Sequence, residues 1–205
     1  MRHNLIIGIG LLVGSLMTGC AGPGERIDLK IPSPVADKTV PAIGSASIAI
    51  QPFEDERTDR LHLGTRHHLW GGESRFSYPS GTLGEATAKA FADYLKGKGW
   101  NATVAHGNEV AGSDITVTGK IVGLRVDAIS GIGQTTLNAK SRMVVQVKNL
   151  ADGSQVRETL SSEGSNQVFW FDPEDAQELL NDLYSKNFEK FVTDTKLEGK
   201  TLKLK

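Results

Sequence analysis

The stretch that decides the fold covers residues 115–149 and reads ITVTGKIVGLRVDAISGIGQTTLNAKSRMVVQVKN. Apolar and polar residues alternate along it, which is the period of a β-strand that buries one face and exposes the other. The apolar residues hold odd positions before Gly123 and even positions after it. The two sets are Ile115, Val117 and Ile121, then Leu124, Val126 and Ala128. Because strand side chains point alternately to opposite faces, this change of parity predicts a β-bulge or twist near Gly123.

Turn residues divide the surrounding region into long antiparallel strands. The segment Ser130-Gly131-Ile132-Gly133 predicts one turn, and Asp152-Gly153 is a strong signal for a second hairpin. The apolar face of the second strand continues across that hairpin, and it holds Leu137, Ala139, Met143, Val145, Val147, Val156 and Leu160. Residues 113–163 therefore predict three long antiparallel strands with one dry face and one wet face.

Two amphipathic helices are expected to cover the dry face. The first begins at Thr82-Leu83-Gly84-Glu85, which matches a capping box, and it ends at Gly97. The second begins at Asp172 as a cap, with Pro173 at the first helical position. The apolar stripe of this second helix holds Ala176, Leu179, Leu180, Leu183, Tyr184, Phe188, Phe191 and Val192.

Short strands are expected on either side of the first helix, at residues 46–53 and 101–105. The predicted fold class is α+β, a two-layer sandwich whose mainly antiparallel sheet has four or five strands. Two long helices pack on one face of that sheet, and the element order is β-α-β-β-β-β-α.

The N-terminus carries the clearest targeting signal. An uncharged apolar run from Leu5 to Met17 follows a basic start and leads into Thr18-Gly19-Cys20. This run is too short and too rich in glycine for a bilayer-spanning helix, and its parts are those of a secretory signal peptide. Its last residues resemble a bacterial lipobox. The resemblance implies that Cys20 is acylated, with palmitate among the expected chains, and becomes the first residue of the mature protein.

Three parts of the chain are predicted from these features. Residues 1–19 are the lipoprotein signal peptide, residues 20–44 are the lipidated N-terminus with a proline-containing tether, and residues 45–205 are a single globular α+β domain. The tether is expected to be mostly extended and to lift the domain off the lipid headgroups. Alternatively, part of it adds an edge strand, because Ile27 and Leu29 alternate with charged residues.

Composition limits the possible partners. The formal net charge of −1 makes the chain a poor candidate for nonspecific nucleic-acid binding, so no nucleic-acid partner is expected. Cys20 is the only cysteine, so a chain acylated there forms no intramolecular disulfide and folds by packing alone. No cofactor is expected beyond the covalent acyl chains on Cys20. The anticipated partners are the membrane, reached through the anchor, another envelope protein and an anionic lipid.

The combined features resemble the YajG-like group of small bacterial lipoproteins. The matching pieces are the lipobox, the strand Ser47-Ile48-Ala49-Ile50 leading into Asp55-Glu56-Arg57-Thr58-Asp59, the helix ending Lys98-Gly99-Trp100, the strand pair through residues 113–149, and the terminal helix ending Val192-Thr193-Asp194-Thr195-Lys196-Leu197. The stretch from His67 to Tyr78 departs from that pattern. An aspartate after the acylated cysteine resembles an inner-membrane retention signal, and Ala21 stands there instead. The resemblance therefore implies the periplasmic face of the outer membrane. The sandwich is also similar to accessory lipoproteins of lipid transport.

The connection at residues 54–79 is much longer than the usual loop and combines arginine with aromatic residues and histidine. This composition is enriched at protein interfaces, so the loop is a candidate contact for a partner protein or an anionic lipid headgroup. The candidate residues are Arg57, Arg60, Arg66, His67, His68 and Trp70. The competing interpretation, which has more weight, is that the aromatic side chains pack locally against the edge of the domain.

Other candidate sites receive a plainer interpretation. His67 and His68 are adjacent on an extended chain and point opposite ways, so no metal site is expected. Basic residues on the wet face are interpreted as solvated charges that keep the sheet soluble, with lipid phosphate as the alternative ligand. They are Lys120, Lys140, Arg142, Lys148 and Arg157. Phe171 is expected to pack on the first turn of the last helix, and Trp170 is expected to be buried.

No catalytic motif supports an enzyme, since the chain holds neither Gly-x-Ser-x-Gly nor a Walker loop. The function expected from the sequence is that of a non-catalytic lipid-anchored envelope protein, an adaptor or assembly factor at the periplasmic face of the outer membrane. The alternative is an accessory lipoprotein of lipopolysaccharide or phospholipid transport that contacts lipid directly. An apolar groove between helices and sheet would favour the alternative, and a filled core would favour the adaptor.

The lipobox generates a direct prediction about the mature chain. Intact mass spectrometry of the protein from its native host is expected to show a chain that starts at Cys20 and carries acyl chains. An unmodified thiol at Cys20, or recovery of the chain in the cytosol, would contradict this prediction.

Overall fold

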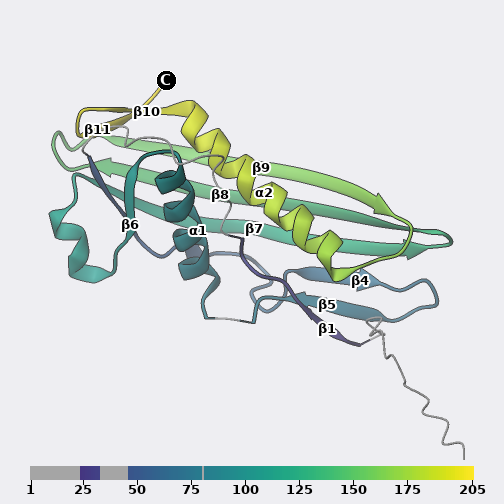
Figure 1. Ribbon diagram of the computed structural model, residues 1–205. Coiled ribbons are helices and arrows are strands. Elements are labelled where there is room, and N and C mark those ends of the chain that lie inside the picture. Colours follow the sequence, from purple (N-terminus) through teal and green to yellow (C-terminus); the bar gives the residue numbers. More distant parts are fainter. Residues whose placement is uncertain (1–23, 33–45, 80) are drawn as a thin grey trace, which may run out of the picture.

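A computed structural model describes residues 24–32, 46–79 and 81–205 (Figure 1). The fold is α+β, with helices α1 (Leu83–Gly97) and α2 (Pro173–Asp194) lying on one face of a nine-stranded sheet. Cys20 and the predicted signal peptide lie outside the described residues, as does part of the predicted tether. In the part of the chain that the structure describes, no helix combines the length and the apolar character needed to cross a bilayer.

The three long strands predicted from the sequence form the antiparallel half of the sheet, in which β9 is the edge. They are β7 (Ile115–Gly131), β8 (Gln134–Asn149) and β9 (Gln155–Val168), and each pairs antiparallel with the next along nearly its whole length. The register of β7 on β8 shifts between Ile121 and Gly123, which confirms the predicted bulge. Side chains on the helix side of β7 and β8 are buried and those on the other side are mostly exposed, as the alternation predicts.

The second edge of β7 pairs with three short parallel strands in succession. These are β2 (Ser47–Ile50), β3 (Glu54–Asp55) and β4 (Gly64–His67). Strand β6 (Asn101–Val104), which follows α1, pairs parallel with β2. The prediction of a mainly antiparallel sheet with four or five strands was therefore wrong in detail, because the sheet is mixed and the connection at residues 54–79 contributes strands to it.

The remaining strands of the sheet form one of its edges. Strand β5 (Glu73–Ser77) makes a hairpin with β4, and β1 (Arg26–Asp28) pairs parallel with β5. This pairing confirms the alternative that part of the predicted tether adds an edge strand. Ile27 and Leu29 are buried in the core, so the segment around β1 belongs to the packed structure.

The helix ends follow the capping signals, with one exception at the C-terminus. The Thr82 side chain accepts a hydrogen bond from the Glu85 amide, and Asp172 and Asp175 form a complete capping box at the start of α2. Helix α2 ends at Asp194, whereas the YajG-like resemblance implied a terminal helix that continues to Leu197. Residues beyond it form a separate hairpin of β10 (Thr195–Glu198) and β11 (Thr201–Leu204). A short 3₁₀ helix at Gly107–Gly112 connects β6 to β7.

Aromatic side chains fill the space between the helices and the sheet. The Phe91 ring of α1 lies 4.9 Å from the Phe188 ring and 5.0 Å from the Phe191 ring of α2, measured between centroids. These three rings and Tyr184 are fully buried. The Tyr184 hydroxyl is hydrogen-bonded to Thr87 at 3.0 Å, which satisfies its polar group inside the core.

Helix α1 packs against the connection that follows β2 through a backbone contact that requires glycine. The amide of Phe53 donates a 3.1 Å hydrogen bond to the carbonyl of Gly84, in the first turn of α1. A Cβ atom at Gly84 would lie 1.8 Å from the carbonyl oxygen of Phe53, far inside any van der Waals contact. The connection that follows β2 is thereby held against the start of α1.

Replacing Gly84 by alanine is therefore expected to lower the free energy of unfolding, by about 1–3 kcal/mol, because the backbones must separate. In a helix alanine is normally more favourable than glycine by about 1 kcal/mol. A loss of stability would therefore show that the clash with the Phe53 backbone outweighs this gain in helix propensity. Gly112→Ala is the matched control, since a Cβ there meets no atom within 4 Å. Urea unfolding measures both, and a stabilised Gly84→Ala protein would contradict the packing described.

Candidate functional site

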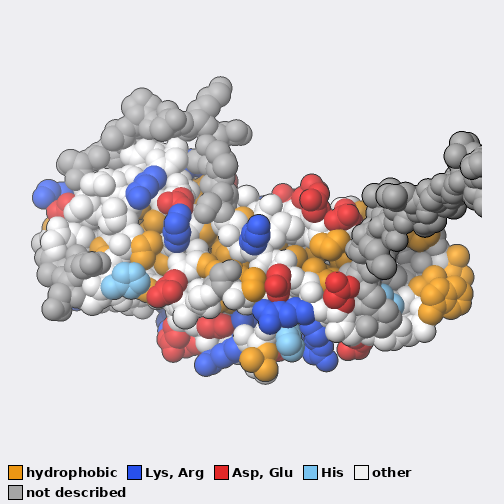
Figure 2. Space-filling model, turned by 60° about the horizontal axis from the view of Figure 1, so that its bottom comes forward, with side chains coloured by type: hydrophobic (Ala, Val, Ile, Leu, Met, Phe, Trp, Pro, Cys, Tyr) orange, Lys and Arg blue, Asp and Glu red, His pale blue; other side chains and the backbone are white. Residues whose placement is uncertain are grey.

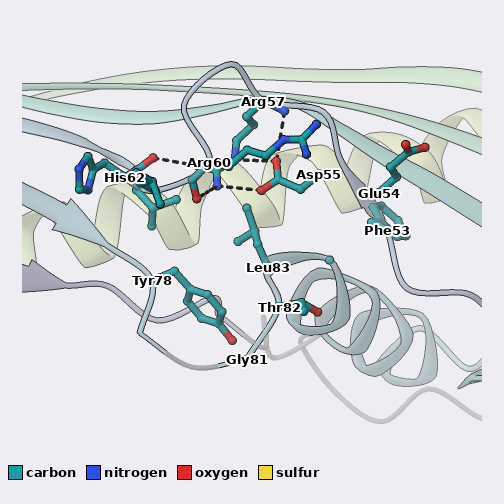
Figure 3. A pocket seen from close by; sticks show the side chains of 13 residues that line it. Phe53, Glu54, Asp55, Arg57, Arg60, His62, Tyr78, Gly81, Thr82 and Leu83 are labelled. Carbon is teal, nitrogen blue, oxygen red and sulfur yellow. Dashed lines mark hydrogen bonds and ion pairs between the residues drawn. The ribbon is translucent and has the colours of Figure 1, made fainter.

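A cavity opens where the chain leaves the edge of β7 between β3 and β4. The Glu56 amide donates to the Ile121 carbonyl, and the edge pairing resumes where the Val126 amide donates to the Leu63 carbonyl. Residues between these two bonds form a loop that projects beside the start of α1 (Figure 3). The cavity has a volume of about 510 Å³, and its lining residues are Phe53, Glu54, Asp55, Arg57, Arg60, Leu61, His62, Leu63, Tyr78, Gly81, Thr82, Leu83 and Gly84.

Arg57 holds this loop in place from within. Its Nε and one terminal nitrogen each donate to the Asp55 carboxylate at 2.9 Å. The other terminal nitrogen donates to the His62 carbonyl at 3.0 Å, and the nitrogen bound to Asp55 makes a longer bond of 3.3 Å to the Arg60 carbonyl. Figure 3 shows the guanidinium between these groups. Both ends of the loop are thus tied to one side chain that is only 5 % exposed.

This arrangement assigns Arg57 and Arg60 different roles. The charge of Arg57 is balanced by Asp55, and the N–H groups of Arg57 donate to groups within the loop. The guanidinium therefore gives little positive electrostatic potential to attract an anion. Arg60 is exposed at the cavity, where its side chain is accessible to a ligand or partner. Of the two arginines predicted as contacts in this loop, Arg60 is accessible to a partner, whereas Arg57 stabilises the loop.

Hydrogen bonds within the loop also shape the other polar groups. The Asp59 carboxylate accepts from the amides of Leu61 and His62, and the bond from His62 lowers the pKa of Asp59 below its usual value. Burial raises the pKa of the Tyr78 hydroxyl above its usual value. Asp59 itself lies outside the cavity, which is lined by the exposed Arg60, by the carboxylates of Glu54 and Asp55, which are paired with cations, and by the Tyr78 phenol. Such a surface suits polar contacts with a partner better than it suits proton transfer.

The other predicted contact residues lie on a different structural unit, the hairpin of β4 and β5. The Arg66 guanidinium stacks on the Phe171 ring at 4.0 Å from its centroid. The Nδ1 atom of His67 lies 3.2 Å from a carboxylate oxygen of Glu73, whereas the His68 ring lies 2.8 Å from the Ser74 hydroxyl, and burial lowers the pKa of His68. Trp70, in the hairpin loop, is 91 % exposed. The structure thus divides the six predicted residues between the cavity and the hairpin.

No trio of His, Cys, Asp or Glu side chains converges as metal ligands would within the described residues. The basic residues of the wet face are exposed, and some are paired with acidic neighbours. Lys120 forms ion pairs with Glu54 and Glu56, and Lys140 forms one with Glu163. These pairs fit the interpretation of a solvated face.

Two aromatic residues that the sequence did not single out as accessible are exposed after β9. Phe169 is 66 % exposed and Trp170 is 80 % exposed, so the predicted burial of Trp170 was wrong. Their rings contact each other edge to face, with centroids 5.2 Å apart, while Phe171 turns inward against the core. The run Val168-Phe169-Trp170-Phe171 gave no periodic signal that separates the buried ring from the exposed ones.

Comparison with known proteins identifies the fold and leaves the family open. No protein-family model matches the chain, and no curated protein matches its sequence. Protein XCC0632 from Xanthomonas campestris, of the family DUF330, has a similar structure with a TM-score of 0.53 and 9 % identity. The match covers 82 % of this chain and 93 % of that one. At this identity the similarity shows a common fold alone.

A looser likeness is found to lipoprotein GNA1162 from Neisseria meningitidis, with a TM-score of 0.39 and 11 % identity. It covers 73 % of this chain and 99 % of that one. At this TM-score the likeness is weaker than that to XCC0632, and the YajG-like resemblance stays a prediction.

The ion pair at the cavity generates a stability prediction. Arg57→Ala leaves the Asp55 carboxylate half-buried and two carbonyls without their donor, so the free energy of unfolding is expected to fall by about 3 kcal/mol. Arg60→Ala is the matched control and is expected to change it by less than about 0.5 kcal/mol, because the side chain is exposed. Equal losses in urea unfolding of the two variants would contradict the different roles assigned to these arginines.

Proposed function

We propose that this chain is a non-catalytic, lipid-anchored envelope protein that acts as an adaptor or assembly factor at the periplasmic face of the outer membrane. The lipobox-like run ending at Cys20 supports the anchor, and Ala21 after it supports the outer membrane as the destination. The fold, which is similar to that of XCC0632, is compatible with this role.

The observation that carries the adaptor role is the filled interface between the helices and the sheet. Phe91, Tyr184, Phe188 and Phe191 occupy this layer and are fully shielded from solvent. A protein that shields a lipid chain inside its body needs an apolar hollow in such a place. The domain has instead a packed core there, so its contacts with partners are made from its surface.

The mechanism is positional. An acyl anchor confines the domain to the plane of the membrane, which raises its effective concentration toward partners in the same envelope. The proposed contact surface is the rim of the cavity, where Arg60 is accessible and Leu61 is 80 % exposed. Arginine is enriched at protein interfaces, and an exposed apolar neighbour adds surface that a partner can bury.

A second candidate function rests on the exposed apolar side chains of the structure. Trp70, Phe169 and Trp170 are open to solvent, and such groups also suit direct contact with lipid. In this alternative the chain is an accessory lipoprotein of lipopolysaccharide or phospholipid transport. It would handle lipid with these loops, outside its packed core.

Site-specific photo-crosslinking in cells tests the adaptor proposal against the alternative. A photo-reactive amino acid at Leu61 is expected to give an adduct with an envelope protein, because this exposed side chain lies at the cavity rim. The matched control is the same amino acid at Leu204, which is 52 % exposed in the C-terminal hairpin and far from the cavity.

The mass of the adducts decides between the two functions. A protein adduct specific to Leu61 supports the adaptor. A lipid adduct at Leu61 favours the transport accessory. Adducts that are the same at Leu61 and Leu204 would contradict a contact surface at the cavity.

A further inference from the structure

One end of the sheet can be followed as a single row of neighbouring residues across five of its strands, β5, β4, β7, β8 and β9. His67 of β4 is paired with Glu73 of β5 and with Ile129 of β7. The row continues from Ile129 to Thr136 of β8 and then to Gln167 of β9. The loops that follow this row belong to the β4–β5 hairpin, the β7–β8 hairpin and the β9–α2 connection, so all three lie at the same end (Figure 1).

Large apolar side chains gather at this end and are open to solvent. Ten large hydrophobic side chains are exposed among the described residues, and six of them belong to these loops or to the row itself. We call these six the apolar end; they are Leu69, Trp70, Ile129, Ile132, Phe169 and Trp170. Figure 2 shows the corresponding hydrophobic surface at the right-hand end of the molecule. Two of these loops also meet, since a Cβ added at Gly133 would lie 3.7 Å from the Phe169 ring.

The described chain also begins at this end. The amide of Gly24 donates a 2.6 Å hydrogen bond to the carbonyl of Glu73, which places Gly24 beside the same row. Cys20 precedes Gly24 by four residues, and a fully extended chain of that length spans about 14 Å. Wherever the intervening residues run, an acyl chain on Cys20 starts within about 14 Å of Gly24.

We propose that the apolar end docks into the interface of the bilayer that holds the acyl chains, and so fixes the orientation of the domain on the membrane. This inference rests on the proposed acyl anchor and adds a second, non-covalent contact with the same membrane. The occupant of the apolar end is the headgroup and upper acyl region of that bilayer. Tryptophan is enriched at this depth in membranes, because its ring is apolar and its N–H group still reaches water.

Charges around the apolar end favour a hydrophobic mode of docking. Arg75 pairs with Glu73 beside it. Asp172 and Glu174 follow Trp170 at the start of α2 and are both exposed, so the surroundings of the apolar end are acidic and do not attract an anionic surface. Docking is therefore expected to proceed on zwitterionic lipid and to gain nothing from anionic lipid, unlike the binding of a basic patch.

Docking by this end sets the direction of the long strands. β7 and β8 meet at the apolar end, so the sheet stands steeply on the membrane and its opposite end projects into the aqueous compartment. The cavity lies beside β7 between Ile121 and Val126, partway up the sheet, where it faces partners that extend from the bilayer.

Quenching of tryptophan fluorescence by brominated lipid tests the docking, because the chain holds three tryptophans in two settings. Trp70 and Trp170 belong to the apolar end, whereas Trp100 is 6 % exposed. Trp100 directly precedes β6, which lies near the start of β7. The start of β7 at Ile115 is roughly 45 Å along the strand from Ile129 of the apolar end, so Trp100 lies far from that end. The full acylated chain, extracted from membranes, is reconstituted in vesicles of phosphatidylcholine brominated on its acyl chains.

We expect strong quenching of the wild-type chain and loss of nearly all of it in the double variant Trp70→Phe, Trp170→Phe, which keeps only Trp100. Adding phosphatidylglycerol is expected to bring no gain in quenching, because no basic patch borders the apolar end. A second variant, Leu69→Asp with Ile132→Asp, retains all three tryptophans and is expected to lose most of the quenching. Leu204→Asp, an exposed apolar position at the opposite end, is the matched control and should behave as wild type.

The outcomes separate this inference from the function on which it rests. The intact mass of the same sample reports acylation, and an unacylated chain overturns the anchor whatever the fluorescence shows. An acylated chain whose Trp70 and Trp170 are not quenched overturns the docking and leaves the anchor standing, and the apolar end then belongs to a protein partner. Quenching that persists in the Leu69→Asp, Ile132→Asp variant also overturns it.

Discussion

The hydrogen bonds along both edges of β7 are the constraint on which the rest of the structure depends. A strand of 17 residues at the centre of a sheet presents amide and carbonyl groups on two sides, and each buried group needs a partner. β8 satisfies one side along its whole length, while β2, β3 and β4 share the other side in series. The chain leaves this second side between β3 and β4, near the bulge at Ile121 and Gly123, and the cavity forms there. The position of the candidate site follows from how the edge of β7 is filled.

The elements predicted correctly from the sequence are those with a strong local signal. Strict alternation in β7 and β8 and capping residues at Thr82 and Asp172 define long elements whatever their neighbours do. β4 and β5 escaped prediction because polar residues such as Thr65 and Ser74 occupy their buried positions. β4 is a strand because it pairs with β7, and β5 because it pairs with β4 and β1. The dipeptide Gly71-Gly72 was the available signal, since paired glycines are typical of tight hairpin turns.

The candidate site was predictable by location and less so by the role of each residue. An unusually long connection rich in arginine and aromatic residues did mark the cavity and the β4–β5 hairpin. Sequence alone could not separate Arg57, whose donors are used inside the loop, from Arg60, which is exposed. The exposure of Trp170 was equally hidden, because it depends on where the β9–α2 connection lies relative to two other loops.

Lipidation and the apolar end together make one claim, that the domain stands on the membrane by the end from which its anchor leaves. Neutron reflectometry of the acylated protein on a supported bilayer measures this geometry directly. The account predicts a protein layer in contact with the headgroups and at least as thick as β8 is long, which is about 54 Å for 16 residues. A water-filled gap between the bilayer and the protein, or a much thinner layer from a sheet lying flat, would contradict it.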